Sequence, residues 1–153
     1  MVAKALVSAA VVAVLAALVA GARGEERLVL VTEQEAALPS AVVAELSRRG
    51  ITRGPQITVV SPPSSSKTVN SPLHLQLKFE SHGGAKIDQS SVKVTYEKTP
   101  AVDLTNRVKP YIQSTGIDIG EADVPPGNHT FRVDVKDSDG RVATTLFSFV
   151  VGK

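Results

Sequence analysis

From position 55 onward, apolar and polar residues alternate with the period of two that β-strands produce. The clearest segments are Leu73–Phe79 and Phe131–Val135, where each apolar residue is followed by a polar one, and Val92–Tyr96 repeats the pattern. Successive side chains of a strand point to opposite faces, so each segment is expected to have one buried and one solvated face. The apolar run Ile57–Val60 predicts a first strand, and Arg141–Val151 predicts a long last one.

Turn-forming residues separate these segments. Asp137-Ser138-Asp139-Gly140 has hairpin-turn composition, with glycine where a positive φ is needed. Two weaker strands are predicted at Val108–Gln113 and Gly116–Ile119. About seven strands with no helical pattern among them predict an all-β fold, and their order favours an antiparallel sandwich over a barrel. The predicted core is Leu75, Leu77, Phe79, Val92, Val94, Phe131, Val133, Val135, Phe147 and Phe149.

Residues 1–22 have the features of a secretory signal peptide. Lys4 supplies a positive start, and Ala5–Ala20 is an apolar run of Ala, Val and Leu with one Ser. Ala20-Gly21-Ala22 fits the small-residue cleavage rule, and Ala22-Arg23-Gly24 is a second candidate, so the mature chain is predicted to begin at Arg23 or Glu25. A membrane anchor is the alternative, but the run is shorter than the roughly 20 apolar residues of a spanning helix. We therefore expect a periplasmic or secreted protein with no membrane span after cleavage.

Residues 23–54 form a predicted N-terminal arm with a different pattern. Leu28–Val31 is a possible short strand, and Thr32 with Glu35 has the spacing of a capping box that starts a helix. The helix could pause at Pro39 and resume through Val42–Leu46. The simplest interpretation is a leader or linker in loose contact with the domain. Alternatively, the arm could bind a partner protein or cover an edge of its own domain.

Composition removes several function classes. The chain has no cysteine, which excludes disulfides, thiolate metal sites and cysteine nucleophiles. Its net charge of +2 comes from a near-balance of acidic and basic residues, and aromatic residues are few. Clustered basic residues with stacking aromatics are typical of nucleic-acid binding, so no nucleic-acid partner is expected.

The candidate chemistry is sparse. His74, His82 and His129 could hold a transition metal only if the fold brought them together, and the single Met lies in the signal peptide. A calcium site would need acidic residues from several loops, for which the candidates are Asp88, Asp103, Asp134, Asp137 and Asp139. We expect neither a metal nor a cofactor.

Two further motifs have ordinary explanations. His82-Gly83-Gly84 is similar to the oxyanion loop of lipases and esterases, but the G-x-S-x-G elbow of those enzymes is absent. Asn128-His129-Thr130 is an N-glycosylation sequon, which matters only in a host that glycosylates exported asparagines. No catalytic residue is predicted, and the protein is expected not to be an enzyme.

Residues 55–151 resemble the bacterial immunoglobulin-like modules, a group close to fibronectin type III and cadherin-like repeats. The resemblance is carried by Pro55–Pro62, Ile87-Asp88, Ser91–Val94, Val124–Val133 and Asp137–Gly140. It implies an immunoglobulin-like domain at 55–153 that serves as a spacer, adhesion or ligand-presenting module. We therefore expect a non-enzymatic interaction module whose partner is another exported or cell-envelope protein. A small-ligand or metal carrier of the same fold is the first alternative, and a small periplasmic hydrolase is the second.

Overall fold

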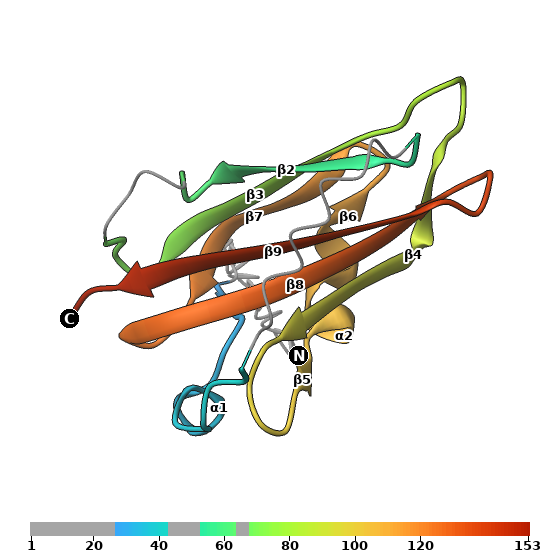
Figure 1. Ribbon diagram of the computed structural model, residues 1–153. Coiled ribbons are helices and arrows are strands. Elements are labelled where there is room, and N and C mark those ends of the chain that lie inside the picture. The colour runs from blue at the N-terminus through green and yellow to red at the C-terminus, as the bar shows by residue number, and fades with distance from the viewer. Residues whose placement is uncertain (1–26, 43–52, 64–67) are drawn as a thin grey trace, which may run out of the picture.

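Two β-sheets pack face to face in the computed structural model, which describes residues 27–42, 53–63 and 68–153 (Figure 1). Sheet 1 has the order β1 (Leu28–Val29), β7 (Gly116–Asp123), β3 (Leu73–Glu80) and β2 (Gln56–Ser61), with β6 (Ile112–Gln113) also paired to β7. Sheet 2 has the order β5 (Val102–Asp103), β4 (Ile87–Tyr96), β8 (Gly127–Asp137) and β9 (Val142–Val151).

The all-β antiparallel sandwich predicted from the sequence is confirmed. Every strand pair is antiparallel except β1 with β7, which is parallel. The chain crosses between the sheets from β3 to β4, from β5 back to β6, and again from β7 to β8. The longest ladder joins β8 to β9, where the register runs without a break from Gly127↔Val151 to Lys136↔Val142.

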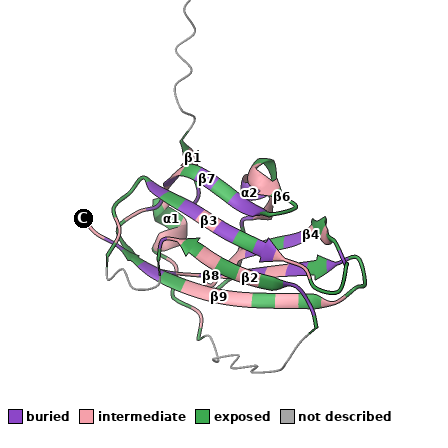
Figure 2. Cartoon of the chain, turned by 90° about the horizontal axis from the view of Figure 1, so that it is seen from above, coloured by how far each residue is buried: buried purple, intermediate pink, exposed green. Residues whose placement is uncertain are grey.

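The core lies between the sheets and is built from the alternate positions that the sequence pattern indicated. Figure 2 shows this alternation as bands of buried and exposed residues along β3. The Phe131 ring lies at the centre and stacks on Tyr96, Phe147 and Phe149 at centroid distances of 5.1, 5.5 and 5.4 Å. Nine of the ten predicted core residues are buried, and the tenth, Phe147, is only partly buried because it lies at the margin of the core.

The predicted strand at Val108–Gln113 is largely wrong. The structure has the helix α2 (Thr105–Val108) and the 3₁₀ helix η1 (Lys109–Tyr111) there, and only Ile112–Gln113 is strand. The Asp103 carboxylate accepts a hydrogen bond from the Thr105 amide at 2.8 Å, which satisfies a free donor where the turn starts. Val108 then packs fully buried in the core, so the same apolar residue serves a helical turn instead of a strand.

The arm is an integral part of the domain over its described residues, so the interpretation as a loose linker is wrong for 27–42. Leu30 and Val31 are 0% and 2% exposed and belong to the core. The short helix α1 (Glu33–Ala36) begins with the predicted capping box, in which Thr32 and Glu35 each bond the other's backbone amide. The arm thus contributes a short strand, two core side chains and a capped helical turn.

The predicted signal peptide at residues 1–22 and the predicted continuation of the helix to Leu46 lie outside the described residues, apart from Val42. Within the described ranges, none of the helices has the length and apolar character needed to cross a membrane.

Candidate functional site

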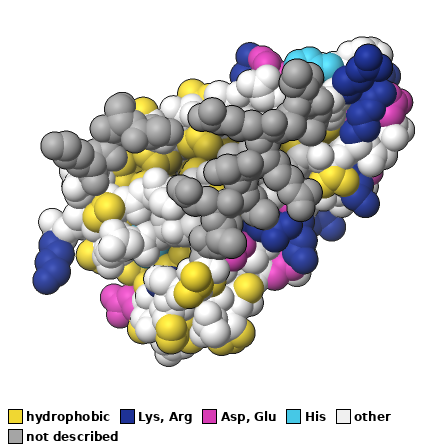
Figure 3. Space-filling view, viewed as in Figure 1, with side chains coloured by type: hydrophobic (Ala, Val, Ile, Leu, Met, Phe, Trp, Pro, Cys, Tyr) yellow, Lys and Arg dark blue, Asp and Glu magenta, His cyan; other side chains and the backbone are white. Residues whose placement is uncertain are grey.

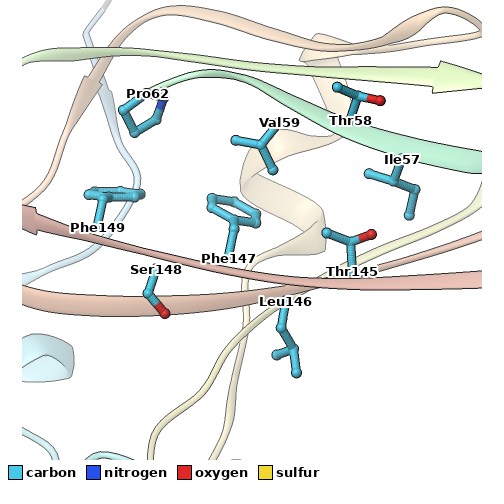
Figure 4. Close-up of a pocket in the computed structure, with 9 residues that line it drawn as sticks. All are labelled: Ile57, Thr58, Val59, Pro62, Thr145, Leu146, Phe147, Ser148 and Phe149. Atoms are coloured by element: carbon cyan, nitrogen blue, oxygen red, sulfur yellow. The ribbon is translucent and has the colours of Figure 1, made fainter. Parts of the chain in front are cut away.

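One side of the sandwich is left open where the edge strands β2 and β9 come together. A groove of about 500 Å³ lies there, and Figure 4 shows the residues that line it: Ile57, Thr58, Val59, Pro62, Thr145, Leu146, Phe147, Ser148 and Phe149. None of these nine residues is charged. We call this side the open edge.

The side chains of β9 point alternately toward β2 and away from it. Thr145, Phe147 and Phe149 point toward β2, while Leu146 and Ser148 point away from it (Figure 4). Phe149 is buried in the core, whereas Thr145 and Phe147 are only partly buried. The groove therefore has an uncharged floor that includes the Phe147 ring, and the described part of the domain does not fully cover it.

The outer backbone of β9 can be assigned residue by residue. Val69 donates its amide to the Val150 carbonyl at 2.8 Å and accepts from the Gly152 amide at 2.9 Å, so the even-numbered residues direct their backbone groups away from β8. The odd-numbered Arg141 confirms this assignment, since its carbonyl accepts from Asp137 across the hairpin. By alternation, Thr144, Leu146 and Ser148 point their amides and carbonyls outward. Within the described residues, none of these backbone groups has a partner.

This edge lacks the features that usually protect edge strands from unwanted pairing. Such protection comes from charged side chains, proline, bulges or a very short strand. The ten residues Val142–Val151 contain no charge and no proline, and their ladder with β8 has no bulge. The other edge strands are protected: β2 has a register shift between Val59 and Ser61, and β5 has only two residues. As far as the described residues go, the outer backbone of β9 between 143 and 149 is therefore available for pairing with another strand.

The three histidines lie in different surroundings and do not form a common site. His74 is exposed on β3 and pairs with Asp118 at 2.7 Å, in line with its polar phase in the sequence. His82 is exposed in the loop between β3 and β4, where His82-Gly83-Gly84 leads into a turn. His129 is buried in the core. Across the described ranges, no three His, Cys, Asp or Glu side chains lie close enough to hold a metal ion.

His129 is held by two hydrogen bonds. Its Nε2 donates to the Pro125 carbonyl at 2.8 Å, which leaves Nδ1 to accept from the Tyr96 hydroxyl at 2.8 Å. Burial lowers the pKa of His129 below its ordinary value and raises the pKa of Tyr96 to about 12, with a smaller contribution from the Glu35 charge to the Tyr96 pKa. Both groups are therefore neutral at physiological pH, and they act as a polar link within the core.

The acidic residues considered for calcium use their oxygens on local contacts. Asp88 accepts from Ser90 and Asp103 from Thr105, and these hydrogen bonds lower the pKa of both carboxyls. Asp134 binds the Arg132 guanidinium at 3.1 Å. They lie on separate elements and share no ligand position in the described parts of the chain.

The last hairpin holds the remaining two acidic candidates. Asp137 is fully buried, and its Oδ1 accepts from the amides of Asp139 and Arg141. Asp139 pairs with Arg141 at 3.0 Å on the surface. Asp137 thus stabilises the turn that the Asp-Ser-Asp-Gly composition predicted.

The described charged side chains on one face of the molecule form no cluster of a single sign. On the face shown in Figure 3, Lys and Arg are dispersed and mixed with Asp and Glu. Asn128 of the sequon is exposed at the start of β8, while Thr130 binds Ser148 at 2.8 Å.

The groove was not predicted from the sequence. One signal for it was present, because β9 is a long strand without any charge, unlike the strands at Leu73–Phe79 and Phe131–Val135. The pairing of β9 next to β2 was not visible in the pattern, because each strand reveals only its own buried face.

Comparisons with known proteins do not assign the chain to a family. Neither the models of protein families nor the sequences of curated proteins give a match. The function must therefore be argued from the site.

Proposed function

We propose that this protein is an exported, non-enzymatic interaction module that binds a partner polypeptide at the open edge between β2 and β9. The observation that carries the proposal is the unprotected outer backbone of β9, which lies beside an uncharged groove. The partner is expected to be another exported or cell-envelope protein, in keeping with the predicted signal peptide.

The strand order supports the expected immunoglobulin-like type of module. In such sandwiches, strands A, B and E form one sheet, and strands C, F and G form the other. Here β2, β3 and β7 lie in sheet 1, and β4, β8 and β9 lie in sheet 2. In modules of this type the first and last strands are neighbouring edges, which is where the groove lies.

The alternatives have less support in the described residues. A metal carrier needs several converging ligands, yet the histidines and acidic residues are spread over separate elements. A hydrolase needs a nucleophile beside a base. The one exposed His–Asp pair, His74 with Asp118, has the Ser61 hydroxyl nearby, but that hydroxyl donates to the His74 carbonyl and not to its ring.

Zinc, copper and calcium are each expected to leave the melting temperature unchanged. Thermal melts with and without each ion test this, because a ligand at a hundredfold its dissociation constant stabilises the native state by about 2.7 kcal/mol. A saturable rise with one ion would favour the carrier over the interaction module.

Site-specific photo-crosslinking tests the proposed surface. A photoreactive residue is placed at Thr144 on the open edge, and as a matched control at the exposed Asn106 in α2, which lies on the side of the domain away from β9 (Figure 2). We expect one defined protein to crosslink from Thr144 and not from Asn106 in the native host. That protein, once purified, must also bind the unmodified chain. Equal crosslinking from both positions would contradict the proposal.

A further inference from the structure

We infer that the partner binds as a short extended segment of about seven residues, which adds as a strand to β9 and places alternate apolar side chains in the groove. This inference rests on the proposed function and specifies the partner of the same surface. Strand addition uses main-chain hydrogen bonds for affinity and side-chain pockets for specificity. The open edge offers both along the same stretch of chain.

The main-chain part is a row of outward groups at Thr144, Leu146 and Ser148. Each of these residues points one amide and one carbonyl away from β8, and none is paired within the described residues. An antiparallel segment opposite them would form a hydrogen-bonded residue pair at each position.

Contacts within the chain limit, at both ends, the stretch of β9 that is free to pair, which we call the window. At one end, Val69 already occupies the backbone of Val150 and Gly152. At the other end, the Arg141 guanidinium binds the Arg53 carbonyl at 3.0 Å, and the buried Gly54 lies against Val142. With respect to the described residues, the free stretch runs from 143 to 149, which is roughly 23 Å of extended chain.

The side-chain pattern follows from the pairing. Residues of the segment that face Thr144, Leu146 and Ser148 direct their side chains to the outer face of the sheet. Leu146 and Ser148 point there in Figure 4, and the Thr144 hydroxyl donates to Asp134 on the same face. The residues between them direct their side chains toward Ile57, Val59 and Phe147 in the groove. The segment is therefore apolar at alternate positions and free of charge where it enters the groove, because none of the lining residues could pair a charge.

A second copy of the chain fits this window poorly. If two copies of β9 paired symmetrically about Leu146, Val142 of the second copy would lie opposite Val150. Val69 already occupies that position. A long edge strand must run past both ends of the window, whereas a chain terminus or an exposed linker can leave the plane of the sheet after a few residues.

A synthetic peptide tests the inference with the intact mature protein. The probe alternates valine and threonine over about seven residues and carries a fluorophore on a Gly-Lys tail, so that anisotropy reports binding. In the expected pairing, the threonine amides face β9 and the valine side chains enter the groove. Two matched probes carry N-methyl groups, one on the threonine amides and the other on the inner valine amides.

We expect methylation of the threonine amides to weaken binding by roughly tenfold or more, because it removes the donors to β9. Methylation of the valine amides is expected to change the affinity by less than about threefold. Equal effects of the two modifications would overturn strand addition.

A pair of protein variants tests the same bonds from the other side. Leu146→Pro removes one outward amide, and its control Leu146→Thr changes the same side chain but keeps the amide. We expect roughly tenfold weaker binding for Leu146→Pro and wild-type affinity, within about threefold, for Leu146→Thr. If Leu146→Pro does not fold, the methylated probes still decide the question.

The remaining outcomes separate this inference from the proposed function. If no probe binds while crosslinks still map to Thr144, the open edge is the binding surface but strand addition is wrong. If the protein dimerises in sedimentation and Leu146→Pro abolishes the dimer, the occupant is a second copy and the short segment is overturned.

Discussion

The two sides of the sandwich differ in whether their sheet edges are covered. A sheet edge exposes backbone donors and acceptors that must be paired, solvated or covered. On one side, which we call the closed edge, the arm at residues 27–42 covers the space between the sheets. On the open edge, β2 and β9 leave a groove. The described arm thus covers one edge, whereas no described segment pairs with the backbone of β9 between residues 143 and 149 on the other.

The closed edge is joined to both sheets. β1 pairs with β7 of sheet 1, and Ser40 forms a bridge with Lys98, which follows β4 of sheet 2. The Lys98 ammonium is itself buried and donates to the Ala36 carbonyl at 3.1 Å. The arm thus links the two layers at their margin.

A charge pair fastens the arm between these attachments. The Arg107 guanidinium of α2 binds both oxygens of Glu35 at 2.7 and 2.6 Å, and also donates to the Leu30 carbonyl at 2.9 Å. Such two-point pairing fixes orientation as well as distance. The Arg107 hydrogen bonds are the main reason that the pKa of Glu35 is lowered to about 2, although burial opposes them.

The largest loss of stability is expected from deleting the arm that covers the closed edge. A mature chain that begins at Arg53 loses the buried Leu30 and Val31 side chains, so it should lose about 4 kcal/mol or more of stability, or aggregate. Denaturant melts and sedimentation measure both results. A truncated chain that melts within about 1 kcal/mol of the full one would show that the arm is dispensable, and would reverse the comparison.

The second-largest loss of stability is expected from a substitution in the core between the two sheets. Phe131→Ala should cost about 3–5 kcal/mol, because the ring is fully buried at the centre of the aromatic cluster. Arg132→Ala, on the opposite face of the same strand, should cost no more than roughly 0.5 kcal/mol. Similar losses for both variants in denaturant melts would mean that the two faces of β8 are wrongly assigned.

The charge pair at the closed edge predicts a loss of stability in acid. Glu35 takes up a proton near pH 4.5 when unfolded and near pH 2 when folded. Between these values the unfolded state binds more protons, so stability falls as the pH is lowered through this window. Glu35→Gln should remove the contribution of Glu35 to this fall and cost roughly 1.5–3 kcal/mol at neutral pH.

Glu33→Gln is the matched control for this prediction, because Glu33 lies exposed on the same helical turn. Its melts should follow the wild type within roughly 0.5 kcal/mol at each pH. An unchanged acid transition in Glu35→Gln would show that the pair does not fasten the arm.

The smallest effect is expected at the open edge. Leu146→Pro removes an amide that has no partner among the described residues, so stability should change by no more than about 1 kcal/mol. Phe147→Pro removes an amide directed toward β8 and should cost about 3 kcal/mol or more. If the two prolines cost the same in thermal melts, the outer backbone of β9 is not free.

The sequence pattern could predict the strands whose faces differ most. Leu73–Phe79 and Phe131–Val135 alternate strictly, and their inward residues are buried. The strand predicted at Val108–Gln113 was wrong because an apolar residue such as Val108 can be buried by a helical turn as well as by a strand. Leu30 and Val31 could not be placed from the pattern, since the unbroken apolar run Leu28–Val31 does not show which residues are buried, and their neighbour β7 lies far along the chain.

The candidate site was less accessible to sequence reasoning for a related reason. Each histidine and aspartate was a plausible ligand by type, but only the fold shows whether side chains converge. The groove consists of residues from the first and the last strand of the domain, such as Ile57 and Phe147. Their contact depends on the order of strands in the two sheets, which no local periodicity contains.

The pairing of β1 with β7 also affects when the protein can fold during its synthesis. The arm is the first described part of the chain to leave the ribosome, yet Leu28 and Val29 find their neighbours only at Ala122 and Asp123. Contacts so distant along the chain form late and slow the folding reaction. The arm therefore cannot complete its pairing until most of the chain has been made. If the protein is exported as we propose, this delay favours export before the fold is complete.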